Sequence, residues 1–244
     1  MRNTGLAEEH GIVINLLKRY LQRLSGKASR MNREFLADLI EPCEKARVLD
    51  IGCGDGKLIT KLAGKIRAGE IYGIEISPKY AEEAHRNNVN IIIDDIDVGL
   101  PFKDDSFDIV ISNQVIEHVN STDNFVKECH RILKNGGKCI VSTPNLATPH
   151  NIFSLILGYQ PPATAVSDEI ICGNPLDPSA GQQIASYRRH RRIFTALSLQ
   201  RLFQYHGFKV EVEKGVGLQP LPLFLSKRFT WTKYSQFLAI KVRK

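Results

Sequence analysis

A buried strand that leads directly into a glycine-rich turn is the feature that most restricts how this chain folds. Val48–Ile51 is apolar apart from Asp50, and glycines alternate with other residues from Gly52 to Gly56. Such glycines let the backbone turn sharply and approach a ligand without interference from Cβ atoms. Lys57–Ile66 then places apolar residues at helical spacing, so the N-terminal amides of a helix are expected to point into the turn. The pattern predicts a nucleotide-type pocket.

The spacing of the glycines separates the ligand classes that use such a turn. A phosphate-binding P-loop needs Lys-Ser/Thr after its last glycine, but here Leu58 follows Lys57, and Gly52 is too close. The dinucleotide pattern G-x-G-x-x-G needs a glycine where Lys57 stands, which argues against a nicotinamide dehydrogenase. The pattern that remains is acid-x-Gly-x-Gly-x-Gly.

Acidic residues end the next two predicted strands. Ile71–Ile76 contains Glu75, and a carboxylate about 20 residues beyond a glycine turn suits the two hydroxyls of a ribose. Asn90–Ile93 is followed by Asp94 and Asp95. The acids are therefore expected to gather at the edge of the sheet where the glycine turn lies.

Further motifs follow in a fixed order. They are an LPF block at 100–102, an SFD strand from 106, a V-x-E-H element at 115–118 and an R-x-L-K-x-G-G turn at 131–137. Together with the glycine turn, they resemble the class I S-adenosylmethionine-dependent methyltransferases of the small-molecule type. The resemblance is close over residues 46–145 and looser in the last third, and Asn135 replaces the family's usual proline.

The resemblance implies a fold and a cofactor. The fold is a Rossmann-like three-layer α/β/α sandwich with a mostly parallel seven-stranded sheet, its last strand antiparallel, and the cofactor is S-adenosyl-L-methionine. Asp50 would orient its ammonium group, Glu75 its ribose, and Asp95, with Asp94 as the fallback, its adenine, which Ile96 would flank. The predicted cofactor-binding residues are Asp50, Gly52, Cys53, Gly54, Gly56, Glu75, Ile76, Asp95, Ile96, Asn113 and Gln114.

Methyl transfer depends mainly on positioning, but a hydroxyl nucleophile benefits from a general base. His118 is the first candidate, Glu117 would orient it, and His190 and His150 are weaker candidates. A purely structural role for the Glu117–His118 pair stays open. The five cysteines form no C-x-x-C pair, so no metal site is predicted.

A single domain is predicted over residues 1–244. Its parts are N-terminal helices in 1–42, a cofactor-binding core in 43–145, a lid or substrate insertion in 146–192, and a C-terminal helix with the last strands in 193–244. The two N-terminal helices, Gly11–Leu24 and Met31–Ile40, would cover a sheet edge or also lean over the cofactor mouth. The insertion is rich in proline and glycine and contains a short apolar helix at Asn151–Leu157.

Composition and charge limit the partners. There is no long apolar run and no signal-peptide pattern, so a cytoplasmic protein without a membrane span is expected. The net charge of +7 includes only one dense basic cluster, at 188–192, which disfavours nucleic acid and fits an anionic small molecule better. The apolar connector Gly215–Trp231 is expected to be a packed loop, and the alternatives are a wall for an apolar substrate and a contact with a lipid surface. The oligomeric state is not predicted.

The first functional hypothesis is methyl transfer to an oxygen of a small molecule. In the family, the Glu-His element and an S-T-P-N strand end, here Ser142–Asn145, accompany methylation of quinones, sugars and other metabolites. Methylation of nitrogen or carbon, of RNA, protein or a lipid-linked acceptor, and a non-catalytic methyltransferase-like subunit remain the alternatives.

Overall fold

The computed structural model describes residues 19, 23, 26–162, 164–177, 179–185, 189–217 and 232–244. Most of the predicted helix Gly11–Leu24 and of the connector Gly215–Trp231 lies outside these residues, as do Tyr187 and Arg188 of the basic region.

The described part of the chain contains one seven-stranded sheet with the order β3-β2-β1-β4-β5-β7-β6. β7 pairs antiparallel with both of its neighbours, and the other pairs are parallel, as predicted. The strands are β1 (Arg47–Ile51), β2 (Glu70–Glu75), β3 (Asn90–Ile93), β4 (Phe107–Asn113), β5 (Leu133–Pro144), β6 (Lys209–Val216) and β7 (Phe237–Arg243).

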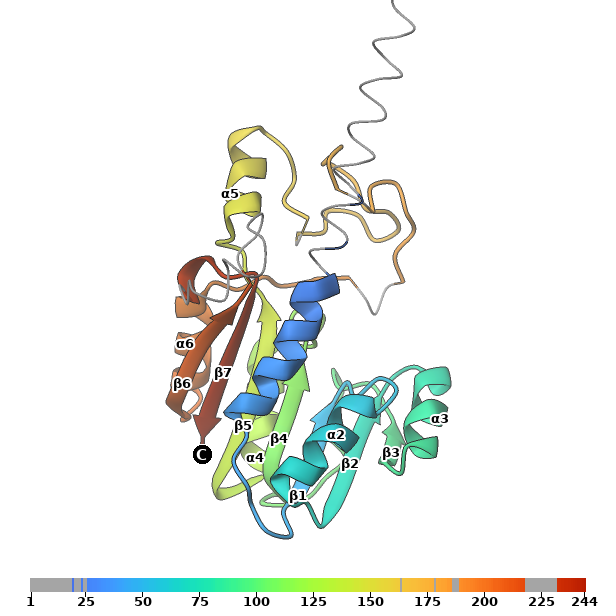
Figure 1. Cartoon of the computed structure of the whole chain (residues 1–244), viewed down its shortest axis with the longest axis vertical. Coiled ribbons are helices and arrows are strands. Elements are labelled where there is room, and N and C mark those ends of the chain that lie inside the picture. Colours follow the sequence, from blue (N-terminus) through green and yellow to red (C-terminus); the bar gives the residue numbers. More distant parts are fainter. Residues whose placement is uncertain are drawn as a thin grey trace, which may run out of the picture.

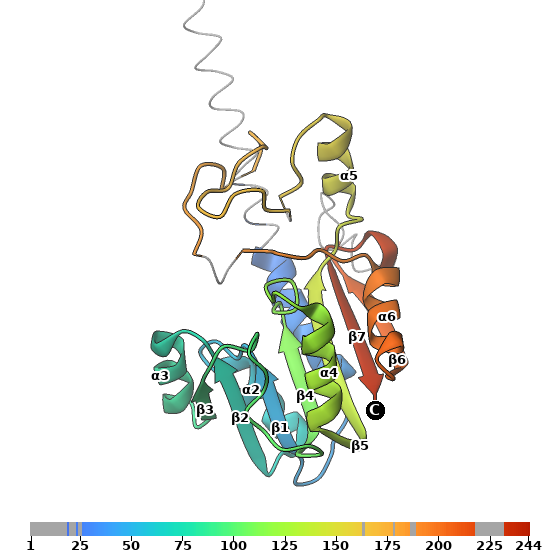
Figure 2. The same ribbon diagram turned by 180° about the vertical axis from the view of Figure 1, so that it is seen from behind.

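Helices cover both faces of this sheet. The helix of residues 26–39, α2 (Lys57–Ile66) and α3 (Pro78–Arg86) pack on one face, and α4 (Thr122–Ile132) and α6 (Ala196–Tyr205) pack on the other (Figures 1 and 2). The remaining helices are α5 (Pro149–Ile156) and the short η2 (Thr232–Tyr234). The three-layer prediction is confirmed, and the helix predicted from Met31 begins earlier, at or before Gly26.

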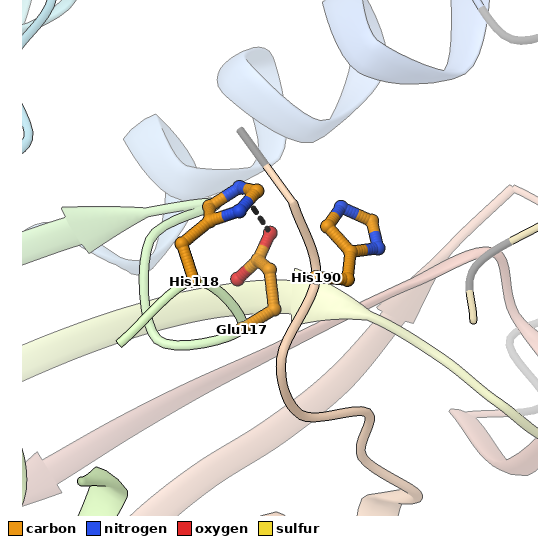
Figure 3. Close-up of side chains that lie close together, drawn as sticks. All are labelled: Glu117, His118 and His190. Carbon is orange, nitrogen blue, oxygen red and sulfur yellow. Dashed lines mark ion pairs between the residues drawn. The ribbon is translucent and has the colours of Figure 1, made fainter. Parts of the chain in front are cut away.

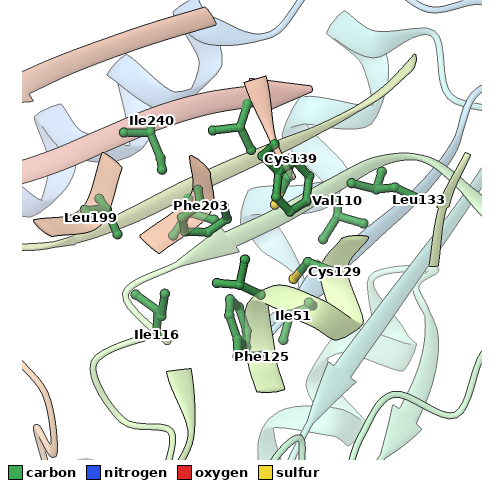
Figure 4. Close-up of a cluster of buried hydrophobic side chains, with 14 of the residues drawn as sticks. Ile51, Val110, Ile116, Phe125, Cys129, Leu133, Cys139, Leu199, Phe203 and Ile240 are labelled. Atoms are coloured by element: carbon green, nitrogen blue, oxygen red, sulfur yellow. The ribbon is translucent and has the colours of Figure 1, made fainter. Parts of the chain in front are cut away.

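Successive side chains of the central strands point to opposite faces of the sheet, and each face has its own hydrophobic core. Val110 of β4 packs toward α4 and α6, whereas its neighbours Ile109 and Ile111 pack toward the helix of residues 26–39 and α2. Phe203 of α6 and Phe125 of α4 fill the first core (Figure 4). These strands therefore have no solvent-facing side, as expected for parallel strands between helical layers.

The order of the strands places a crevice at the end of β1. β1 lies between β2 and β4. From β1 to β3 successive strands are added toward one edge of the sheet, and from β4 onward they are added toward the other edge. The connections after β1 and β4 therefore leave to opposite faces. The register pairs Ile51 with Ser112 and with Ile74, which brings the carboxyl ends of the three strands level. In open α/β sheets, ligands bind at such a switch point.

The insertion of residues 146–192 rises above the carboxyl ends of the strands (Figures 1 and 2). It contains α5, close to the predicted Asn151–Leu157, and an isolated antiparallel bridge between Ile170 and Gln183. Its two ends meet: Asn145 bridges Phe194, and the amide of Leu146 donates to the carbonyl of Phe194 at 2.8 Å. Among the described helices, none has the length and apolar character that crossing a membrane requires.

Candidate cofactor and acceptor site

A cavity of about 650 Å³ opens at the carboxyl ends of β1, β2 and β4. The predicted site residues that line it are Gly52, Gly54, Glu75, Ile76, Asp95, Ile96, Gln114, His118 and His190. The structure thus joins the predicted cofactor side and the predicted acceptor side in one space. Asp50, Cys53, Gly56, Asn113 and Glu117 do not line it and lie in or behind its walls.

The glycine turn has the backbone that the sequence predicts. Gly52, Gly54 and Gly56 have φ values of 70°, 56° and 74°, in the left-handed region that favours glycine. A Cβ atom at Gly56 would lie 2.9 Å from Val89 Cγ2 and 3.0 Å from Ala84 Cα, so this glycine permits close packing against α3. Gly52 and Gly54 line the cavity, whereas Gly56 shapes the turn from behind.

Glu75 ties the turn to the end of β2. Its Oε2 accepts a hydrogen bond from the amide of Gly54 at 3.0 Å, and its Oε1 accepts one from the amide of Ser77 at 2.9 Å. The side chain also lines the cavity. The carboxylate is therefore held in a fixed position, with lone pairs left for a ligand hydroxyl.

We expect Glu75→Ala to weaken S-adenosylmethionine binding by about 1.5 to 3 kcal/mol, because a charge-assisted hydrogen bond to the ribose is lost. Titration calorimetry measures the change. Glu75→Gln removes the charge but keeps the shape of the side chain, so it shows which of the two matters. Glu82 is an exposed acid on α3, and Glu82→Ala is the matched control. A Glu75→Ala protein that binds like the parent would show that the ribose assignment is wrong.

Asp50 is buried beneath the turn, with 2% of its surface exposed. Burial, together with the negative charge of Glu75, raises its pKa from 3.8 to about 8. The carboxyl therefore holds a proton at neutral pH when no cation is near. A cationic ligand in the cavity would favour the ionised form.

We expect cofactor binding at pH 6.5 to release close to one proton, since the ammonium and sulfonium charges lower the pKa of Asp50. Calorimetry in buffers of different ionisation enthalpy counts this proton, and Asp50→Asn is expected to release none. The raised pKa also means that the folded parent binds this proton more tightly than the unfolded chain. Protonation of Asp50 therefore adds to the free energy of unfolding at low pH, and this contribution is lost as the pH rises from about 4 to about 8. If Asp50→Asn releases as many protons as the parent when the cofactor binds, Asp50 is not the group that loses the proton.

The predicted adenine end is lined by both Asp94 and Asp95. Asp94 Oδ1 accepts from the amide of Asp95 at 2.8 Å, and Asp95 Oδ1 accepts from the amide of Asp97 at 3.0 Å. Asp97 in turn accepts two hydrogen bonds from Asn120, at 2.7 and 2.6 Å. These contacts join the loop after β3 to the loop after β4, and the choice of Asp95 over Asp94 stays a prediction.

Gln114, at the end of β4, adopts a φ of 61°, which is uncommon for a residue other than glycine. Its amide donates to Ser142 O at 2.8 Å and its Nε2 donates to Ser142 Oγ at 3.0 Å, which fixes it at the cavity wall. Asn113 instead accepts from Asn32 Nδ2 at 2.8 Å. Cys53 packs against β2, where a Cβ atom at Gly73 would lie 2.5 Å from its sulfur. The side chains of Asn113 and Cys53 thus support the wall.

Glu117, His118 and His190 lie together (Figure 3), and the two histidines also line the cavity. His118 Nε2 is 3.9 Å from Glu117 Oε1, and the rings of the two histidines are 4.9 Å apart. Glu117 is 1% exposed, and burial raises its pKa to about 8. The amides of Arg191 and Arg192 donate to the carbonyl of Glu117 at 2.7 and 3.1 Å, which holds the segment that follows His190 against Glu117.

Several cavity residues were not predicted from the sequence. Tyr80 of α3, Asn120 and Arg191 line the cavity. Tyr80 lies on a short amphipathic helix, where nothing in the pattern marks a ligand contact, and Arg191 was one of several arginines in the basic cluster. His150, by contrast, does not line this cavity, and burial lowers its pKa to about 4.

Known proteins resemble this chain in sequence and fold. Residues 49–141 match a family described as a methyltransferase domain. A Mycolicibacterium smegmatis protein named a probable S-adenosylmethionine-dependent methyltransferase is 30% identical over 184 residues, which are 73% of this chain and 58% of that protein. The ubiquinone biosynthesis O-methyltransferase of Pelagibacter ubique is 32% identical over 124 residues, 48% of this chain and 49% of that protein.

A solved S-adenosylmethionine-dependent methyltransferase from Mesorhizobium loti superposes with a TM-score of 0.61, at 19% identity, over 86% of this chain and 96% of that one. The chain spans about half the length of the two curated relatives named above. The strand order, the glycine turn and the cavity define a Rossmann-like methyltransferase domain. Residues 49–141 therefore form a methyltransferase domain of the matched family, whose cofactor is S-adenosylmethionine.

Proposed function

We propose that the protein transfers the methyl group of S-adenosylmethionine to an oxygen of a small molecule. The observation that carries the proposal is that a single cavity is lined both by Glu75 and the glycine turn and by His118 and His190. Such a cavity can hold a sulfonium and a nucleophile in line, which supplies most of the catalysis in a methyl transfer.

The acceptor side supports an oxygen nucleophile. A hydroxyl must lose its proton as it attacks, and an imidazole is suited to accept it near neutral pH. His118 is the proposed proton acceptor, Glu117 positions it, and His190 contacts the acceptor. The name of the Pelagibacter ubique relative, a ubiquinone biosynthesis O-methyltransferase, agrees with oxygen as the acceptor atom.

A second cavity supports an acceptor with an apolar part. It measures about 180 Å³ within the insertion, and His190 lines both cavities. Its apolar wall includes Pro161, Val166, Ile170 and Ile184. An apolar cavity of about 150 Å³ holds a benzene molecule, so this one has room for a group of that size. The proposed acceptor is therefore a hydroxylated molecule with an apolar or aromatic part.

Incubation of the protein with labelled S-adenosylmethionine and fractionated cell extract tests the proposal. Label is expected in a low-molecular-weight, partly apolar fraction, and a set of phenols and catechols then defines the acceptor atom. Label that enters only RNA or protein would overturn the small-molecule proposal. Cofactor binding without any label transfer would favour the alternative of a non-catalytic subunit.

A further inference from the structure

One carboxylate and two imidazoles from two distant parts of the sequence gather beside the cavity. Glu117 and His118 follow β4, and His190 comes from the end of the insertion. One potential ligand atom from each lies within 4.8 Å of the others (Figure 3). Two imidazoles and a carboxylate form the donor set of many catalytic zinc sites.

The carboxylate of Glu117 is only half satisfied by the protein. Its Oε2 accepts from Thr143 Oγ1 at 3.0 Å, but its buried Oε1 has no hydrogen-bond partner among the described residues. A buried oxygen without a partner is costly, and it is rare in native proteins. Oε1 is also the oxygen nearer to His118 Nε2, so a cation between them would satisfy it.

The surroundings of His118 match those of a metal-bound imidazole. Its Nδ1 lies 3.0 Å from the carbonyl oxygen of Arg189. When Nδ1 donates to this carbonyl, the lone pair is on Nε2, which faces Glu117. Metal-ligating histidines commonly donate their other ring N–H to a carbonyl in this way, which fixes the tautomer and the ring orientation.

We propose that Glu117, His118 and His190 bind a divalent transition-metal ion of the zinc type, with an open coordination position toward the acceptor cavity. The two imidazoles favour zinc, cobalt or iron over magnesium and calcium, which prefer oxygen ligands. Donor atoms about 2.1 Å from a tetrahedral ion lie roughly 3.4 Å apart, so the present 4.8 Å spacing would contract by up to about 1.4 Å. Both histidines are only partly buried, which leaves room for this movement.

The chemical use of this site rests on the proposed function. An acceptor hydroxyl at the open position would lose its proton to solvent more readily, because a bound cation lowers the pKa of an oxygen ligand. The oxygen lone pair then forms the bond to the methyl carbon, and the electrons of the broken C–S bond stay on the cofactor sulfur. In this state His118 is a ligand, and the ion replaces it as the group that activates the hydroxyl.

Metal binding to the full chain tests the site without turnover. After treatment with a chelator, the protein is titrated with Zn²⁺ by calorimetry and with Co²⁺ by visible absorption. We expect one ion per chain. Glu117→Gln, His118→Ala and His190→Ala are each expected to weaken binding by at least the roughly 10- to 100-fold that loss of an outer-shell partner costs, and to alter the Co²⁺ band.

His206→Ala is the matched control, because His206 Nε2 lies 2.7 Å from Asp123 Oδ1 in another histidine–carboxylate pair, outside the cavity. It is expected to bind like the parent. Absence of stoichiometric binding, or equal losses in His206→Ala and the three site variants, would overturn the proposed metal site. S-adenosylmethionine binding and thermal unfolding of the same variants report whether they fold. A failure of cofactor binding in the parent would instead count against the proposed function.

Discussion

Gly56→Ala is expected to destabilise the protein by about 2 to 5 kcal/mol. A left-handed backbone costs an alanine roughly 1 to 2 kcal/mol, and an overpacked contact costs roughly 1 to 3 kcal/mol more. The contact is severe here because the new Cβ would lie 3.0 Å from Ala84 Cα, a backbone atom of α3 that cannot rotate away. Urea unfolding with an unchanged m-value measures the loss.

Gly64→Ala is the control for this experiment. Gly64 is within α2, and a Cβ there would have no atom within 4 Å. Alanine is the better helix former, so this variant is expected to gain roughly 0.5 to 1 kcal/mol. If Gly56→Ala unfolds at the same urea concentration as the parent, the close packing of the turn against α3 does not determine stability.

His118→Ala is expected to lower kcat by about 10²- to 10⁴-fold, the usual contribution of a general acid or base. The affinity for S-adenosylmethionine is expected to change little, because the cofactor contacts are assigned to Glu75 and the glycine turn and His118 is assigned to the acceptor. Single-turnover methyl transfer and calorimetry separate the two effects once an acceptor is identified.

His206→Ala serves again as the control, and full activity is expected. A His118→Ala enzyme that keeps the parent's kcat would favour the structural role of the Glu117–His118 pair. If catalysis depends on His118 as a base alone, the loss is independent of added Zn²⁺. If it depends on the proposed ion, added Zn²⁺ raises the parent's rate and leaves the variant's rate low.

The fold could be predicted from the sequence because its main signals are local. The glycine turn requires positive φ values, and the acids after successive parallel strands must meet at one edge, so Glu75, Asp95 and Gly54 line the same cavity. The reversed last strand was inferred from the family resemblance and is confirmed.

The acceptor site could not be assembled from the sequence to the same degree. His190 reaches Glu117 through backbone hydrogen bonds from Arg191 and Arg192, and no periodicity or spacing records such a contact. The prediction of no metal site rested on the cysteines and did not consider a cluster formed across the insertion. Asn113 and Cys53 stand in the motifs of the family and were predicted to bind the cofactor. Their side chains support the cavity wall instead, which depends on packing that the sequence does not show.

The closure of the insertion at its base has a consequence for how such proteins diversify. Because Leu146 and Phe194 are hydrogen-bonded to each other, the sheet does not depend on the length or conformation of the chain between them. The entropy of closing a loop rises only slowly with its length, so residues can be added or removed there at little cost to folding. The acceptor specificity can therefore change by insertion and deletion, while the part that binds the methyl donor stays the same.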